Sequence, residues 1–156
     1  MKKVVNKIKK ITKSNPSTQK PKQDLCNSNF INNSVTNDFI IYTSPSCSSC
    51  KKVQSWFKSN SIGFTEKNIL KHNFETDEIK EIIKYSHSGF EEIISNRSKE
   101  LKNNRHKIYN SRVDQIIEFI KENPTVLKRP IIIQQSKHRI QVGFKKEQIE
   151  IFLRKD

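Results

Sequence analysis

Cys47 and Cys50 are the residues best suited to covalent chemistry, because two thiols three positions apart can form a disulfide across one helical turn. The thiolate is the reactive form of cysteine, and a helix N-terminus stabilises it through unpaired backbone N–H groups and the helix dipole. A β-branched and aromatic run, residues 39–43, precedes the pair, and Cys50, Val53 and Phe57 follow at helical spacing. This order predicts a redox-active dithiol, with Cys47 exposed as the attacking thiol and Cys50 beneath it as the resolving thiol.

Other roles for the cysteines remain open at this point. Half of a structural zinc site has the same spacing, but such a site needs four ligands. The sequence has no second C-x-x-C motif, and its four histidines form no H-x-x-x-H pair. Two buried structural cysteines are the other alternative. We favour redox chemistry and expect neither a metal nor a cofactor. Cys26 has no neighbouring group that would activate it, so we expect an inert thiol there.

Pro130 begins a second apolar run, residues 130–133, and Arg129 precedes it. A proline that starts a later strand in a fold of this kind is often cis and packs against the dithiol. An ordinary edge-strand proline is the alternative. We expect a cis bond, with Arg129 facing the thiolate. A guanidinium in that position can stabilise a thiolate or hold an oxyanion through two parallel hydrogen bonds.

The remaining patterns indicate the elements that position these residues. Residues 62–69 alternate like a second strand, and Thr76, Asp77 and Glu78 read as the cap of a helix that Gly89 ends. Further elements are expected at residues 90–94 and 113–121 (apolar helical stripes), 130–133 and 139–143 (strands), and 146–153 (helix). This order predicts the α/β class: a thioredoxin-like core with a mixed four-stranded sheet, and a helical insertion between its βαβ and ββα halves.

Residues 1–38 differ in composition from the rest of the chain. They hold eight lysines and two aspartates, and so carry +6 of the net charge of +14. We expect a basic, disordered N-terminal arm over 1–38 and one folded domain over 39–156. The overall charge predicts attraction to nucleic acid, anionic lipid or acidic protein surfaces. No apolar run is long enough to cross a membrane, so we expect a cytoplasmic protein without membrane contact.

The motifs resemble a known family over residues 39–153. Four stretches carry the resemblance: residues 41–52, Gly89 with residues 92–99, residues 127–133, and residues 141–144. They resemble the Spx proteins, bacterial stress regulators within the wider Spx/ArsC family. The arm before Phe39 is foreign to that pattern.

The resemblance implies a transcriptional regulator that acts under thiol or oxidative stress and binds the C-terminal domain of the RNA polymerase α subunit. By position, Cys47 and Cys50 are then the disulfide switch, and Arg97 and Arg129 are the two arginines near the thiols. Gly89 matches a glycine in the surface that meets the α subunit, where a side chain would obstruct close approach. We expect a monomer when free, with promoter DNA contacted only indirectly, through polymerase.

Three rival functions follow from the same residues. An arsenate reductase-like enzyme would use Cys47 as nucleophile, with Arg97 and Arg129 around an oxyanion and Arg139 as an additional candidate. A general thiol oxidoreductase would reduce protein disulfides. Direct DNA binding would suit the charge, but no helix-turn-helix or zinc-finger signature is present. We therefore expect a regulator rather than an enzyme.

Overall fold

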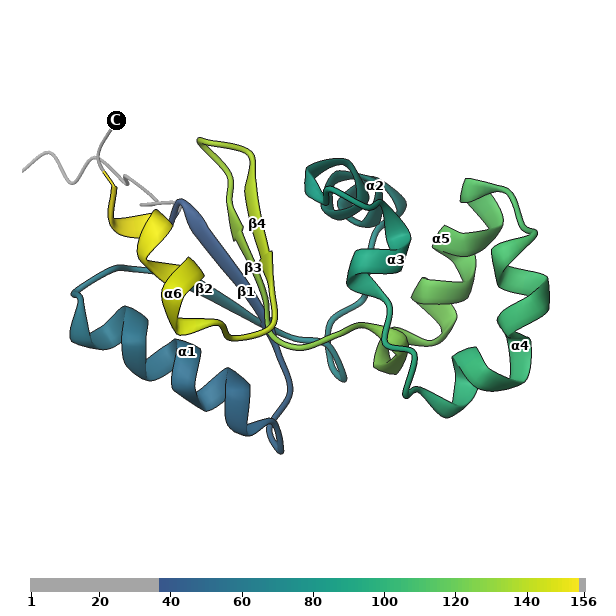
Figure 1. Cartoon of the computed structure of the whole chain (residues 1–156), viewed down its shortest axis with the longest axis horizontal. Coiled ribbons are helices and arrows are strands. Elements are labelled where there is room, and N and C mark those ends of the chain that lie inside the picture. Colours follow the sequence, from purple (N-terminus) through teal and green to yellow (C-terminus); the bar gives the residue numbers. More distant parts are fainter. Residues whose placement is uncertain (1–36, 155–156) are drawn as a thin grey trace, which may run out of the picture. The chain divides into compact units, whose positions relative to one another are not determined.

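The computed structural model describes residues 37–154, which form a mixed four-stranded sheet with helices on both faces (Figure 1). The strands lie in the order β2-β1-β3-β4. They are β1 (Phe39–Thr43), β2 (Thr65–Asn68), β3 (Ile131–Gln134) and β4 (Arg139–Val142). β1 pairs with β2 in parallel, and the other two pairings are antiparallel. The predicted thioredoxin-like α/β fold is confirmed.

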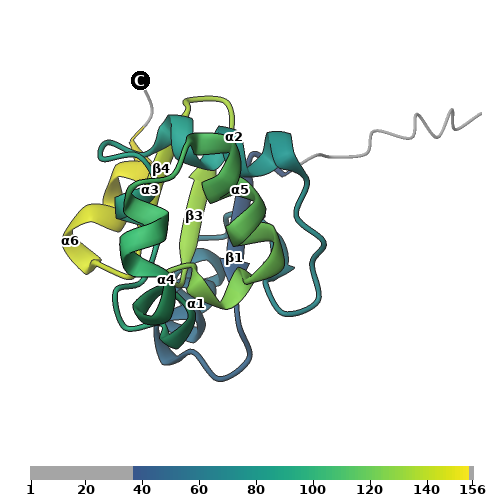
Figure 2. The same ribbon diagram turned by 90° about the vertical axis from the view of Figure 1, so that its right-hand side faces the viewer.

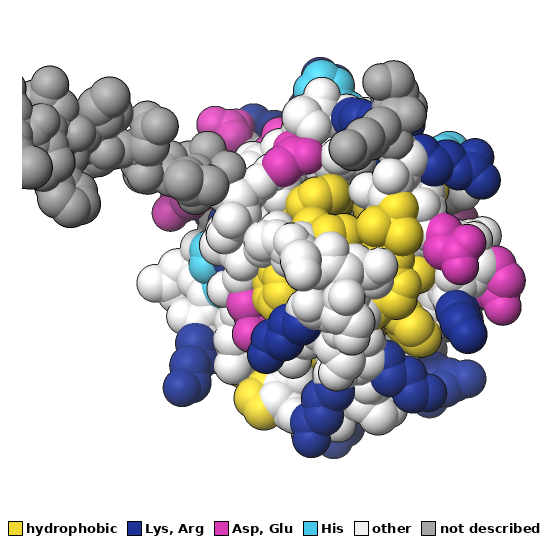
Figure 3. Space-filling view, turned by 90° about the vertical axis from the view of Figure 1, so that its left-hand side faces the viewer, with side chains coloured by type: hydrophobic (Ala, Val, Ile, Leu, Met, Phe, Trp, Pro, Cys, Tyr) yellow, Lys and Arg dark blue, Asp and Glu magenta, His cyan; other side chains and the backbone are white. Residues whose placement is uncertain are grey.

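One face of the sheet is covered by α1 (Ser48–Ser59), α6 (Lys146–Ile149) and the 3-10 helix η2 (Glu150–Leu153). Ile41 and Ile132 point to this face and pack with Val53 and Phe57 of α1. Figure 3 looks onto this side and shows apolar side chains gathered over it, with Lys and Arg side chains around them. Since successive strand residues alternate in direction, Tyr42, Ile131 and Ile133 join the core on the opposite face.

The helical insertion covers that opposite face, as Figure 2 shows. It consists of α2 (Thr76–Tyr85), α3 (Phe90–Ile93), α4 (Lys99–Tyr109), α5 (Val113–Glu122) and the 3-10 helix η1 (Pro124–Val126). Its apolar stripes bury Ile79, Ile82, Leu101, Ile116 and Ile120 against the sheet and one another. The larger of the two apolar clusters therefore lies between the sheet and the insertion.

Several boundaries differ from those expected. The residue that caps α2 is Glu75, with no side-chain hydrogen bond to the helix, and Thr76 is already helical. α4 is not predicted by the sequence pattern, because only Leu101 and Ile108 are buried among its polar residues. Its start is instead fixed by Ser98, whose hydroxyl accepts the Leu101 N–H at 3.1 Å.

Asp38 belongs to the folded domain rather than to the arm. Its carboxylate accepts hydrogen bonds from the Gln134 amide at 2.9 Å and from both the backbone N–H and the hydroxyl of Ser136. The folded domain therefore includes at least one residue before Phe39. The disorder expected for the arm and the inertness expected of Cys26 concern residues outside the part of the chain that the structure describes.

A part-buried carboxylate, Glu78 of α2, joins the insertion to the sheet. It accepts hydrogen bonds from the Tyr42 hydroxyl at 2.7 Å, from Lys67 of β2, and pairs with His72 Nε2 at 2.7 Å. Burial raises the pKa of Glu78, but the hydrogen bonds from Lys67, His72 and Tyr42 lower it more, so it lies below its ordinary value. Glu78 is thus held as a carboxylate at neutral pH.

Candidate functional site

Cys47 lies between β1 and α1 and caps the helix with its own side chain. Its backbone is extended, and its Sγ accepts the Cys50 N–H at 3.3 Å. The Cys47 N–H donates to the Ser44 carbonyl at 3.2 Å, which fixes the turn that leads into α1. The sulfur therefore faces unpaired amides of the first helical turn and the positive end of the helix dipole, while remaining partly exposed.

Cys50 lies one turn further along and is 1% exposed. Burial is the main cause that raises its pKa to about 12, followed by its contact with Cys47. The backbone of Ser44 and the charge of Arg129 oppose that rise only in part. Cys47 and Cys50 are not joined in the structure, and a neutral, buried Cys50 lies beneath a partly exposed Cys47.

A basic cavity of about 520 Å³ opens beside Cys47. It brings together Arg97 and Arg129, which the sequence singled out, although the two lie far from Cys47 along the chain. Lys128 adds a third cation. The other lining residues are Ser95, Asn96, Leu127, Val142 and Gly143. Three cations beside a cysteine at a helix N-terminus can stabilise a thiolate or bind a small anion.

The cavity is assembled by contacts between the segment that follows α3 and the segment that follows η1. Ile94 and Leu127 form an isolated antiparallel bridge. On either side of it, the Lys128 N–H donates to the Ile93 carbonyl and the Ser95 N–H to the Val126 carbonyl, both at 2.7 Å. These bonds set the segment that carries Arg97 against the turn that carries Lys128 and Arg129.

The Arg129–Pro130 peptide bond is cis, the isomer expected from the sequence. Pro130 is buried, and its carbonyl accepts the Gly143 N–H at 2.7 Å. That bond extends the β3–β4 pairing to the cavity wall. Arg129, the residue before the proline, therefore lies at the end of the sheet and lines the cavity. Its positive charge acts to lower the pKa of Cys50.

Arg139, the third arginine of the arsenate reductase hypothesis, does not lie in this cavity. It begins β4, where its backbone pairs with Gln134, and its guanidinium donates to the Ile151 carbonyl at 3.3 Å. The placement expected of Arg139 around an oxyanion is therefore wrong, because the β3–β4 hairpin carries this residue to the end of β4 that is distant from Gly143.

Gly89 also lies apart from the cysteine cavity, at the start of α3. Its φ of 62° and ψ of −144° belong to a backbone region that is essentially restricted to glycine. A Cβ added there would meet no atom within 4 Å. Its neighbours His87 and Glu92 line a second cavity of about 470 Å³, which also involves β4 and α6. Gly89 is thus an open surface position next to a hollow.

Six of the nine residues that line the cysteine cavity were not singled out as site residues from the sequence, among them Lys128 and Asn96. Lys128 had a signal, since it adjoins Arg129, whereas Asn96 had none, because the Ile94–Leu127 bridge that positions it is a long-range contact. Over residues 37–154, the structure contains no cluster of three or more histidine, cysteine or acidic side chains suited to a metal ion. Within the same range, no helix is long and apolar enough to span a membrane.

The sequence pattern of the ArsC family matches residues 42–152. The global transcriptional regulator Spx of Listeria monocytogenes serovar 1/2a is 41% identical over 113 residues, which cover 72% of this chain and 85% of that protein. The protein of the same name from Bacillus subtilis strain 168 is 39% identical over the same shares of each chain.

Solved structures agree on the fold. A protein from Bacteroides fragilis that is described as ArsC family related superposes with a TM-score of 0.65 at 24% identity, covering 74% of this chain and 98% of that one. Arsenate reductase from Vibrio cholerae gives a TM-score of 0.62 at 16% identity, with 74% and 94% covered. At these identities the likeness concerns the fold alone, whereas the sequence relatives are matched over most of their length and are named as regulators. The chain therefore belongs to the ArsC family, and within it to the group of Spx transcriptional regulators.

Proposed function

We propose that this protein binds the C-terminal domain of the RNA polymerase α subunit under thiol stress, and that a Cys47–Cys50 disulfide switches this binding. The observation that carries the proposal is the cavity that places Arg97, Lys128 and Arg129 beside a partly exposed Cys47. A role in transcription is supported by the relatives, which are named as transcriptional regulators. The protein acts in the cytoplasm as a monomer when free, and it approaches promoter DNA only through polymerase.

The redox step is the oxidation of two thiols to one disulfide. The Cys47 thiolate attacks an electrophilic oxidant, and the Cys50 sulfur then displaces the reduced oxidant from Cys47. Two electrons pass to the oxidant and the two thiol protons are lost. The high pKa of Cys50 keeps it a thiol until Cys47 is oxidised, and Cys50 loses its proton only as the new S–S bond forms in the second step.

The step changes the charge in the cavity. Before oxidation, a Cys47 thiolate can pair with Arg129; afterwards, no sulfur in the pair carries a charge. Arg129 is then freed to pair elsewhere, and the turn at residues 127–129 shifts. Because the Lys128 N–H is bonded to the Ile93 carbonyl, the shift reaches α3 and the Gly89 surface at its start. We expect polymerase to meet the protein at this surface, where the open space outside Gly89 permits close approach.

The test is a pull-down of the purified C-terminal domain of the α subunit with the full chain, reduced by dithiothreitol or oxidised by diamide. We expect oxidation to change the amount captured, and we expect Cys47→Ser to be insensitive to diamide. A Cys26→Ser variant serves as the matched control and should respond like the wild type. Failure to capture the α domain in both redox states would overturn the proposal.

Arg129→Ala tests the coupling between the dithiol and the binding surface. The variant should still form the disulfide, because both cysteines are unchanged. Its affinity for the α domain, measured by fluorescence anisotropy, should differ less than about twofold between the reduced and oxidised forms, since the charge that moves the turn is missing. The control is Arg112→Ala, a largely exposed arginine at the start of α5. Equal redox dependence in wild type and Arg129→Ala would remove Arg129 from the switch.

The cavity also favours a second candidate function, an arsenate reductase-like reaction with Cys47 as nucleophile. Three cations around about 520 Å³ suit a tetrahedral oxyanion. Against this function, Cys50 lies directly beneath Cys47 and would divert it into an intramolecular disulfide. Arsenate turnover with glutathione and glutaredoxin as reductants, lost in Cys47→Ser, would support the enzyme.

A further inference from the structure

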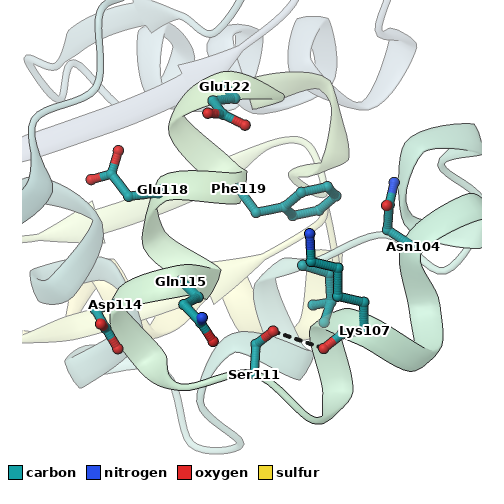
Figure 4. Close-up of a pocket in the computed structure, with 9 residues that line it drawn as sticks. Asn104, Lys107, Ser111, Asp114, Gln115, Glu118, Phe119 and Glu122 are labelled. Atoms are coloured by element: carbon teal, nitrogen blue, oxygen red, sulfur yellow. Dashed lines mark hydrogen bonds between the residues drawn. The ribbon is translucent and has the colours of Figure 1, made fainter.

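A groove of about 300 Å³ separates α4 from α5, on the part of the insertion that does not carry the cysteine cavity. Figure 4 shows the Phe119 ring projecting from α5 toward α4, with Asn104 and Lys107 on the α4 side. Ile108, 3% exposed, lines the groove together with the partly buried Phe119. The groove volume is therefore large enough to hold one or two apolar side chains of a partner protein. It is at the lower end of the range for pockets that bind drug-sized ligands.

The α5 rim of this groove is acidic, in a chain with a net charge of +14. Asp114, Glu118 and Glu122 recur every fourth residue, about 6 Å apart along the helix axis, and all three line the groove. Figure 4 shows them on α5, following one another from its first turn to its last. The rim therefore spans about 12 Å, the length of two helical turns of a partner.

Nothing within the described residues offsets the charge of this rim in full. Asp114 and Glu118 make only exposed ion pairs, with Arg112 at 3.6 Å and with Lys121 at 3.1 Å, and such pairs contribute little. The Glu122 side chain makes no hydrogen bond or ion pair with any residue in 37–154, and it occupies the last turn of α5, where the helix dipole disfavours a carboxylate. Like charges four residues apart on a helix are also mutually destabilising. The row is thus unfavourable for the isolated domain.

We propose that the α4–α5 groove is a docking site for a basic amphipathic helix of a protein partner. One or two large apolar side chains of that helix insert beside Phe119, and Lys or Arg residues at four-residue spacing along one flank pair with the acidic rim. Lys107 lies on the opposite wall and would repel a second basic flank, so the partner helix is basic on one flank only. Two independent observations support this occupant: the apolar floor, and the acidic row whose charge is only partly compensated. The proposal does not depend on binding to polymerase.

The probe is a fluorescein-labelled synthetic helix of about 18 residues, long enough to hold helical structure, with leucines on one face and lysines on one flank of that face. A matched peptide carries glutamates in place of the lysines. Binding to the reduced full chain is measured by fluorescence anisotropy, and the contact is mapped by NMR shifts of labelled protein. We expect the lysine peptide to bind and to shift the amide NMR signals of α4 and α5. We expect this binding even though the net positive charge of the protein as a whole would repel the peptide.

The charge-neutral variant Glu118→Gln/Glu122→Gln should weaken this binding about tenfold, since two rim ion pairs are lost. Both positions are exposed, so the variant should fold normally. Glu147→Gln/Glu150→Gln on the opposite side of the sheet is the matched control, and should bind the lysine peptide like the wild type. Equal binding of the two peptides, or an unchanged affinity in Glu118→Gln/Glu122→Gln, would overturn the proposal. So would self-association of the wild type that this variant abolishes, which would assign the groove to a second copy of the chain.

Discussion

Iodoacetamide should alkylate Cys47 at least about a thousand times faster than Cys50 in the folded, reduced protein at about pH 8. Only the thiolate reacts, and a pKa of about 12 leaves roughly one Cys50 sulfur in ten thousand ionised at that pH. The Cys50 side chain is also 1% exposed, so the reagent cannot reach it without local opening. Cys47 lies at the surface end of the same helical turn and is partly exposed, so the reagent can reach it.

The measurement uses mass spectrometry of two variants, Cys47→Ser and Cys50→Ser, each in a Cys26→Ser background so that one thiol is observed at a time. In urea the two rates should converge, because unfolding removes both the burial and the helix N-terminus. Comparable rates in the folded protein would contradict the assignment of Cys47 as the first sulfur to react.

Glu78→Ala should destabilise the domain by about 3 kcal/mol at neutral pH, a large share of the stability of a domain of this size. The substitution leaves the Tyr42 hydroxyl, on a side chain that is 1% exposed, without its acceptor. It also leaves Lys67 and His72 without the carboxylate that they share. Urea unfolding followed by circular dichroism measures the loss.

Glu75→Ala is the matched control for Glu78→Ala. Glu75 is exposed and caps α2 without a side-chain hydrogen bond, so we expect its loss to change the free energy of unfolding by less than about 0.5 kcal/mol. If Glu78→Ala were equally mild, the carboxylate would not be what holds α2 on the sheet.

The effect of Glu78→Ala should depend on pH with a definite sign. The pKa of Glu78 in the folded protein lies below its ordinary value of 4.5, so its stabilising contribution is fully present above pH 4.5. That contribution is lost as the pH falls through the lower folded-state pKa. The difference in unfolding free energy between wild type and Glu78→Ala should therefore shrink in acid, which a series of urea titrations at decreasing pH would measure.

The sheet and the dithiol could be predicted because their signals are local. A few neighbouring residues are enough to identify the apolar runs of β1 and β3. They are also enough to place Cys47 between a strand and an amphipathic helix. α4 escaped prediction because two buried residues seven positions apart give too weak a periodicity. Its position depends on packing within the insertion, which no local pattern contains.

The composition of the site was only partly predictable, for a related reason. Arg129 adjoins Pro130, and so could be placed beside the thiols from the sequence. The error at Arg139 arose because a residue type was counted without its place on the hairpin. The Glu78 network was missed entirely, because Tyr42 reads as an ordinary strand residue and His72 as an isolated histidine until α2 folds back onto the sheet.

The bridge between Ile94 and Leu127 has a consequence for how such a protein can change over time. Residues 95–126 form an excursion through α4 and α5 whose two ends are joined by this bridge, while its apolar side chains pack into the core formed with α2 and the sheet. Substitutions on the exposed faces of those helices should change the α4–α5 groove without moving the backbone bonds that frame Cys47. In the proposed roles, the α4–α5 groove lies apart from the cysteine site and is free to diversify while that site is kept, whereas the Gly89 surface is tied to the cysteine site through the Lys128–Ile93 bond.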